Sequence, residues 1–140
     1  MRNFGILILG ILFTTLSAFS GKQYTINAEL VEIQYYSKCN CTKSNPILVR
    51  VKYKVRDVQL KNLKQINSFD GGISTTTPVT DIDKDGGVIY QFCISETGIK
   101  NFSTVFIDET GRQSNPVFVK VNPAHSKIIA GTAPVTLKVE

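Results

Sequence analysis

Residues 47–58 read ILVRVKYKVRDV, and this stretch decides the fold. Apolar Val49, Val51 and Tyr53 alternate with charged residues, and a period of two residues predicts a β-strand. One face of such a strand is packed and the other meets water, as in an antiparallel sheet that is covered on one side. The pattern therefore predicts a solvated basic strand face that carries Arg50, Lys52, Lys54 and Arg56.

The same period of two residues recurs along the chain, and no segment shows a sustained helical stripe. One alternating segment changes phase near Leu30–Val31, which predicts a single bent strand with a β-bulge. Another is interrupted by Glu109-Thr110-Gly111-Arg112, which predicts a hairpin turn because Gly111 is free to take a positive φ. The further strands are predicted in residues 24–35, 61–80 (a short pair), 87–95, 101–121 (the hairpin) and 134–140.

Length and composition fit one small domain. The chain has 140 residues, a formal charge of +5 and 42% hydrophobic residues. These values exclude a two-domain enzyme, a disordered chain, a collagen-like repeat and a dense disulfide knot. Six or seven short strands in such a chain predict an all-β fold, an antiparallel β-sandwich.

The late hairpin carries a family resemblance. Its turn, Asp108-Glu109-Thr110-Gly111, and its re-entry, Ser114-Asn115-Pro116-Val117, resemble the last two strands of extracellular immunoglobulin-like and fibronectin type III-like domains. The resemblance covers residues 102–121 and implies an immunoglobulin-like β-sandwich over residues 21–140. The sequence departs from both families because it has no core Trp. The resemblance therefore implies the architecture and no binding residue.

Residues 1–20 have the form of a signal peptide. Arg2 precedes an apolar run that is too short to span a bilayer comfortably, and small Ala18 and Ser20 suit a cut before Gly21. The alternative, an uncleaved membrane anchor, is disfavoured by the short run. We therefore expect a secreted, extracellular protein (periplasmic or at the cell surface in a bacterium) without stable membrane insertion of the mature chain.

The chain has three cysteines, and the expected export determines their redox state. In an oxidising compartment, Cys39, Cys41 and Cys93 predict at least one disulfide. Cys93 is expected to pair with Cys39 or Cys41, which share a polar loop, and both pairings stay open. The third thiol allows a disulfide-linked dimer.

Two segments match the Asn-x-Ser/Thr glycosylation pattern, at Asn40 and Asn101. In a eukaryotic secretory pathway Asn40 is the better candidate because it lies in a polar loop, whereas Asn101 opens a strand. In a bacterium both matches are attributed to chance.

A run of alternating carboxylates, Asp81, Asp83 and Asp85 before Gly86, matches the start of a calcium loop. The run lacks the end of such a loop. When Asp81 is counted as position one, position twelve is Phe92, where a calcium loop needs a bidentate Glu. We therefore prefer an acidic turn before a strand and keep Ca²⁺, the one cofactor considered, as the weaker hypothesis.

The basic strand face admits two interpretations. Such a ladder could meet an acidic polysaccharide, an anionic lipid or a nucleic acid. No aromatic residue is interleaved on that face to stack bases or sugars, so a solvated face that keeps the sheet from aggregating is favoured. Nucleic acid is not an expected partner.

Catalytic motifs are absent from the sequence, although His125 could join a Ser/His/Asp set in space. The sequence therefore predicts a non-enzymatic binding or adhesion-type module that recognises an extracellular protein or a glycan. The contact would be made by loops at residues 37–45, 81–87 and 109–114, or by edge-strand addition. The alternatives are a calcium-dependent carbohydrate-binding or adhesion module, a structural coat or matrix subunit, and a small hydrolase that uses His125.

Overall fold

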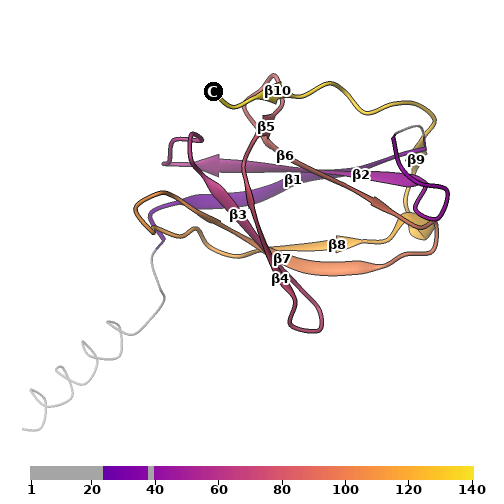
Figure 1. The fold of residues 1–140 in the computed structure, drawn as a ribbon, viewed down its shortest axis with the longest axis horizontal. Helices are drawn as coiled ribbons and strands as arrows, with labels where there is room; N and C mark the ends of the chain where they lie inside the picture. Colours follow the sequence, from indigo (N-terminus) through magenta and orange to yellow (C-terminus); the bar gives the residue numbers. More distant parts are fainter. Residues whose placement is uncertain (1–23, 38–39) are drawn as a thin grey trace, which may run out of the picture.

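The computed structural model describes residues 24–37 and 40–140, which form two β-sheets packed face to face (Figure 1). The larger sheet contains, in spatial order, β10 (Leu137–Lys138), β5 (Asp81–Ile82), β6 (Val88–Ile94), β2 (Ile47–Arg56), β1 (Asn27–Tyr36) and β9 (Ile128–Ile129). The smaller sheet contains β4 (Ser74–Pro78), β3 (Lys64–Phe69), β7 (Lys100–Ile107) and β8 (Val117–Val121). A short 3₁₀ helix, η1, spans Pro123–His125. The predicted all-β architecture of two layers is confirmed.

The strand pairing follows the alternation in the sequence. Neighbouring strands pair antiparallel except for β1 and β9, which pair parallel. The register of β1 against β2 shifts between Leu30 and Glu32, so the predicted bulge is confirmed. The hairpin of β7 and β8 and the strand pair β3 and β4 are confirmed as well. The expected terminal strand is reduced to the two residues of β10.

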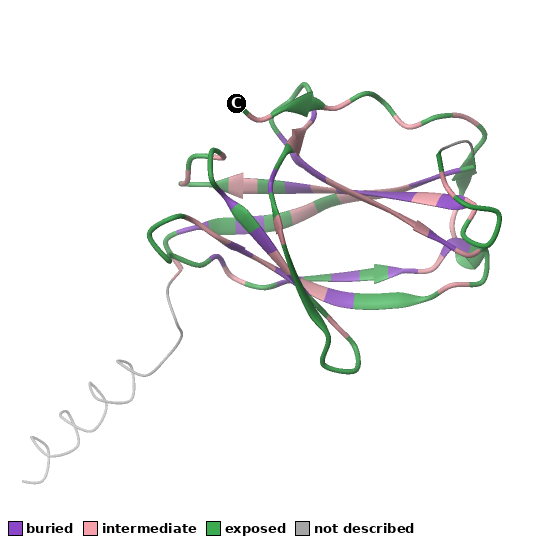
Figure 2. Cartoon of the chain, viewed as in Figure 1, coloured by how far each residue is buried: buried purple, intermediate pink, exposed green. Residues whose placement is uncertain are grey.

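The core lies between the sheets, on the inward faces of β2 and β7 (Figure 2). Val49, Val51 and Tyr53 are fully buried, as the alternation predicts. The ring of Tyr53 meets the ring of Phe106 edge to face, with centroids 5.3 Å apart. Burial of such side chains is the main stabilising contribution to this fold.

A buried polar chain ties the two sheets together. Thr104 Oγ1 on β7 donates to Asn67 Oδ1 on β3 at 2.8 Å, and Gln65 Nε2 donates to the same oxygen at 3.0 Å. The hydroxyl of Tyr53 therefore donates to Thr104 Oγ1, also at 2.8 Å. Burial raises the pKa of Tyr53 far above its usual value, so this donor stays protonated.

One disulfide joins Cys41, in the loop between β1 and β2, to Cys93 on β6. This finding selects Cys41 from the two predicted partners of Cys93. The bond connects residues 52 positions apart, and on the chain-entropy model such a crosslink contributes about 4 kcal/mol. The predicted signal peptide and Cys39 lie outside the described residues.

The C-terminal segment crosses the outer face of the larger sheet. β9 and β10 are its opposite edge strands, five inter-strand intervals or about 24 Å apart. Residues 130–136 connect them, and an extended chain from Ile129 to Leu137 reaches about 26 Å. Figure 1 shows this segment, here called the strap, running along one side of the sandwich from β9 to β10. The outward-pointing Arg50 and Ile89 of this face are buried, with 4% and 6% exposure.

Candidate functional site

The basic strand face is not the solvated ladder that the alternation predicts. Arg50 is buried, and its Nη1 lies 3.4 Å from Gln34 Oε1 and 4.0 Å from Glu32 Oε1. Arg56 is exposed and pairs with Glu29 on β1 at 3.3 Å. The prediction is wrong for Arg50 because the sequence pattern of β2 does not reveal what covers its outer face.

Lys52, the next residue of this face, fills the space beside the acidic turn. Its Nζ forms an ion pair with Asp83 Oδ2 and lies 3.5 Å from Asp85 Oδ2. The side chains of Lys52 and Asp83 are only 15% and 10% exposed. Asp81 instead pairs with Lys138 of β10. Lys54, the fourth basic residue, is exposed.

The three proposed calcium ligands therefore lie beside lysine ammonium groups. Within residues 24–37 and 40–140 no group of three His, Cys, Asp or Glu side chains is placed to hold a metal ion. An ammonium group occupies the position that a cation would take between Asp83 and Asp85. This arrangement favours the acidic-turn interpretation over the calcium hypothesis.

The pKa values of the pair agree with two charged partners. The hydrogen bond to Asp83 raises the pKa of Lys52, and the charges of both aspartates add to this effect against the opposing effect of burial. Burial acts to raise the pKa of Asp83. Hydrogen bonds from Lys52 and from two backbone N–H groups outweigh it, so the pKa of Asp83 is lowered.

Residues 83–87 form a tight hairpin turn between β5 and β6. Asp83 Oδ1 accepts the backbone N–H groups of Asp85 and Gly87 at 2.9 and 2.8 Å. The backbone N–H of Asp83 donates to the carbonyl of Gly87 at 2.9 Å, and Gly86 takes a φ of +84°. The carboxylate is thus a structural part of the turn.

Residues 108–112 repeat this turn between β7 and β8. Asp108 Oδ1 accepts the backbone N–H groups of Thr110 and Arg112 at 3.0 and 2.9 Å, and Gly111 takes a φ of +90°. The side chain of Arg112 supplies the cation, with Nε 2.7 Å from Asp108 Oδ2. The hydrogen bond from the Thr110 hydroxyl, followed by those from Arg112, lowers the pKa of Asp108 to about 2.

The second turn forms one wall of a polar depression of about 400 Å³. The other wall is the loop of residues 57–61, between β2 and β3. Asn62 Nδ2 joins the two walls by donating to Glu109 Oε2 at 3.1 Å. The lining residues are Asp57, Val58, Gln59, Lys61, Asp108, Glu109, Thr110 and Arg112. Most of them are exposed, so the depression faces solvent.

The three predicted binding loops do not lie together. Residues 109–114 and the 83–87 turn lie at the end of the sandwich where β2 ends and β3 begins, whereas residues 37–45 precede β2 at the opposite end. Residues 57–61 were not predicted. Asp57 and Asn62 adopt positive φ values of 65° and 61°. Asp and Asn tolerate this conformation, and their presence beyond a strand was the available signal for a specific turn.

The remaining predicted site residues are at the surface. Asn40 is exposed next to the disulfide, and Asn101 is exposed on the outer side of β7. His125 is exposed at the end of η1.

No family model matches the chain, and no curated protein or solved structure matches it significantly. The class of protein is therefore defined by the fold, a small all-β domain of two sheets with one disulfide. Among the residues that the structure describes, no helix has the length and apolar character needed to cross a membrane.

Proposed function

We propose that the chain is a secreted immunoglobulin-like binding module that recognises an extracellular protein or a glycan through the depression between residues 57–61 and 108–112. The observation that carries this proposal is the construction of the two walls. The backbone of the 108–112 wall is fixed by two hydrogen bonds to the Asp108 carboxylate. The other wall is held by the hydrogen bond from Asn27 to the Asp57 carboxylate and by a backbone turn in which the N–H of Leu63 donates to the carbonyl of Leu60. Preorganised loops on a rigid scaffold lose little entropy on binding.

The strand order supports the immunoglobulin-like type. In that fold, strands A, B, E and D form one sheet and strands C, F and G the other. Here β1, β2, β6 and β5 are neighbours in one sheet, and β3, β7 and β8 in the other, with β4 beside β3. The depression then lies between the B–C and F–G loops, which recognise ligands in variable domains.

The cross-links of the core depart from the antibody pattern, in which a disulfide joins strands B and F. In this chain the corresponding strands β2 and β7 are joined by the hydrogen bond from Tyr53 to Thr104. The disulfide instead joins Cys41, which precedes β2, to Cys93 on β6. A disulfide is compatible with secretion. The proposal of secretion rests mainly on residues 1–20, which have the form of a signal peptide.

A binding screen with matched charge reversals tests the proposal. The multimerised domain is screened on a glycan array and against a library of extracellular domains. We expect a ligand whose binding falls about tenfold or more with Lys61→Glu, in the depression, and persists with Lys43→Glu, in the opposite loop. A ligand that responds to Lys43→Glu and not to Lys61→Glu would overturn the proposed surface.

Analysis of the protein from its native source tests the location. We expect a secreted product that begins near Gly21 and carries the Cys41–Cys93 disulfide. Retention in the cytosol with reduced cysteines would refute secretion. A disulfide-linked dimer in a non-reducing gel would favour the coat or matrix alternative, which depends on Cys39.

A further inference from the structure

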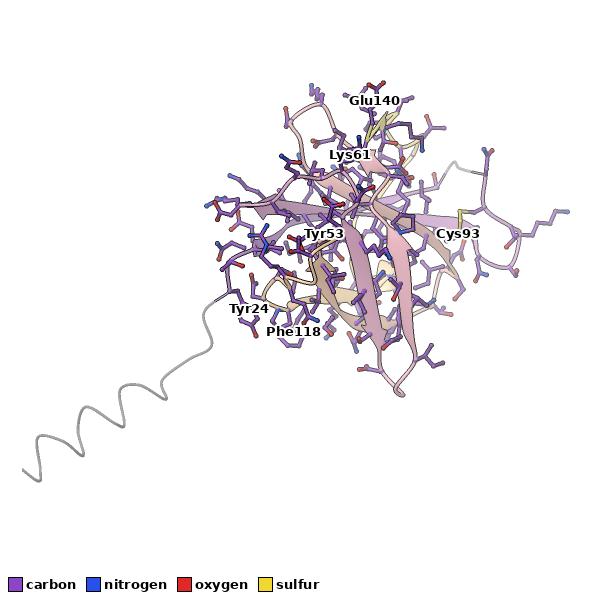
Figure 3. All side chains as sticks on the ribbon, turned by 60° about the vertical axis from the view of Figure 1, so that its left-hand side comes forward. Tyr24, Tyr53, Lys61, Cys93, Phe118 and Glu140 are labelled. Carbon is purple, nitrogen blue, oxygen red and sulfur yellow. A yellow bond between two sulfur atoms is a disulfide. The ribbon has the colours of Figure 1, made fainter. Side chains whose placement is uncertain are left out.

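Phe118 is an aromatic side chain that the fold leaves uncovered. It lies on β8 with 77% of its surface exposed, while its neighbours Val117 and Val119 are buried in the core. Figure 3 shows Phe118 at the surface, whereas Tyr53 lies inside the sandwich. A large ring held on a strand of an open sheet face is available to a partner.

Asn101 lies close to this ring on the adjacent strand. In the pairing of β7 with β8, Ser103 is opposite Phe118 and Asn101 is opposite Lys120. Asn101 is therefore the diagonal neighbour of Phe118, a separation that an aromatic side chain spans. Both residues border one depression of about 260 Å³, together with Ser68, Asp70, Ser103 and Lys120 among others.

The acceptor pattern Asn101-Phe102-Ser103 is presented on this face. Strand alternation points Asn101 and Ser103 outward and buries Phe102 at 4% exposure. The backbone carbonyl of Asn101 accepts the N–H of Asp70, and within the described residues the Asn101 side chain makes no hydrogen bond. A chain attached to Nδ2 of Asn101 would leave toward solvent without disturbing the core.

We propose that Asn101 carries an N-linked glycan whose first N-acetylglucosamine packs on the ring of Phe118. In the transfer, Asn101 Nδ2 forms a bond to carbon C1 of a lipid-diphosphate-linked oligosaccharide and loses a proton, and the bond from C1 to the diphosphate breaks. The C–H groups of the sugar then cover the ring, and its hydroxyl and acetamido groups reach Ser68 and Asp70. This inference rests on the proposed secretion in a eukaryotic host.

Asn40 and Asn101 are both exposed, and what distinguishes Asn101 is the exposed ring of Phe118 on the adjacent strand. A glycan here would cover the outer face of the smaller sheet. The depression between residues 57–61 and 108–112 would then be left as the accessible recognition surface.

Peptide mapping of the protein secreted by its native source tests the modification. The denatured protein is treated with a glycan amidase before digestion, and we expect the tryptic peptide of residues 101–112 to carry Asp in place of Asn101 only after this treatment. An unmodified peptide from a secreted, disulfide-bonded protein overturns the inference and leaves the proposed function standing. A cytosolic product with reduced cysteines overturns both.

Thermal unfolding tests the contact with the ring. In an Asn40→Gln background, enzymatic deglycosylation is expected to lower Tm by about 3 °C. The decrease should vanish with Phe118→Ser and persist with the control Val135→Ser, which removes an exposed apolar side chain outside this depression. An equal decrease in the Phe118→Ser protein would overturn the packing of the sugar on Phe118.

Discussion

The two turns at residues 83–87 and 108–112 have the same backbone design in different surroundings. In each, an Asp carboxylate accepts two backbone N–H groups, a Gly three residues later takes a positive φ, and a cation pairs with the second carboxylate oxygen. The first turn draws its cation, Lys52, from a neighbouring strand, whereas the second uses its own Arg112.

This difference separates a tertiary contact from a local one. The side chains of Asp83 and Asp108 are both 10% exposed, but their partners Lys52 and Arg112 are 15% and 48% exposed. Asp83 ties the β5–β6 turn to β2, whereas the side-chain hydrogen bonds of Asp108 lie within its own turn. The comparison shows that a run of carboxylates before a glycine can be a hairpin device rather than a metal loop. We expect the following variants to separate the two turns.

Loss of the carboxylate should show the largest difference. Asp83→Ala leaves Lys52 largely buried beside Asp85 alone and removes two hydrogen bonds to the backbone, so we expect a loss of about 3 kcal/mol in the free energy of unfolding. Asp108→Ala should cost less because its partner Arg112 is exposed to water. Urea denaturation of both variants measures the difference, and an equal or reversed order would contradict the comparison.

Loss of the cation should have a smaller effect. Lys52→Met leaves Asp83 with its backbone donors but without its ion pair, and we expect a loss of about 2 kcal/mol. The double variant Lys52→Met/Asp83→Asn should recover part of this loss because no unpaired charge remains. Asp83→Asn alone completes the cycle, and a double variant whose loss equals the sum of the losses of Lys52→Met and Asp83→Asn would show that the residues do not interact.

The glycines should behave alike in both turns. Gly86 and Gly111 have φ values of +84° and +90°, and an added Cβ meets no atom within 4 Å at either position. Gly86→Ala and Gly111→Ala are therefore each expected to cost about 1 kcal/mol from backbone strain alone. Chemical denaturation checks this, and a clearly larger loss for Gly86→Ala would show that burial matters at this position too.

Acid should weaken both turns. A carboxyl with a lowered pKa stabilises the fold above the pKa of an unfolded Asp, about 3.9. This stabilisation is lost as the pH falls through the folded value, which for Asp108 is about 2. The pH dependence of the free energy of unfolding should therefore be flatter for Asp108→Asn than for wild type between about pH 4 and 2. Identical slopes in this range would contradict the assigned shift.

Calcium should have no effect, because the Lys52 ammonium lies between Asp83 and Asp85. Millimolar Ca²⁺ is expected to leave Tm unchanged in wild type. A rise that disappears with Asp83→Ala would restore the calcium-dependent alternative.

The sequence predicted what depends on neighbours along the chain. The period of two residues located the main strands and the buried faces of Val49, Val51 and Tyr53, because alternation is a local property. Arg50 is buried and contacts Gln34 and Glu32 of the neighbouring strand β1, and the pairing of Lys52 depends on a turn contributed by another strand pair. Neither contact can be predicted from the sequence of β2 and the residues next to it.

The sequence also contains a local signal for the two turns. The segments Asp83-Lys84-Asp85-Gly86 and Asp108-Glu109-Thr110-Gly111 share an Asp and a Gly three residues apart. Because the second segment lies in a predicted hairpin, this shared pattern supports the acidic-turn interpretation of the first.

The attachment of the strap at opposite edges of one sheet also determines how the domain would respond to mechanical load. Tension applied at Glu140 acts first on β10. The two residues of β10 separate from β5 more easily than the long strands β1 and β2 separate from each other. Separation of β10 frees residues 130–140, a segment that is about 36 Å long when extended, while the disulfide and the core stay in place. The domain could therefore yield to a pull at this end without unfolding.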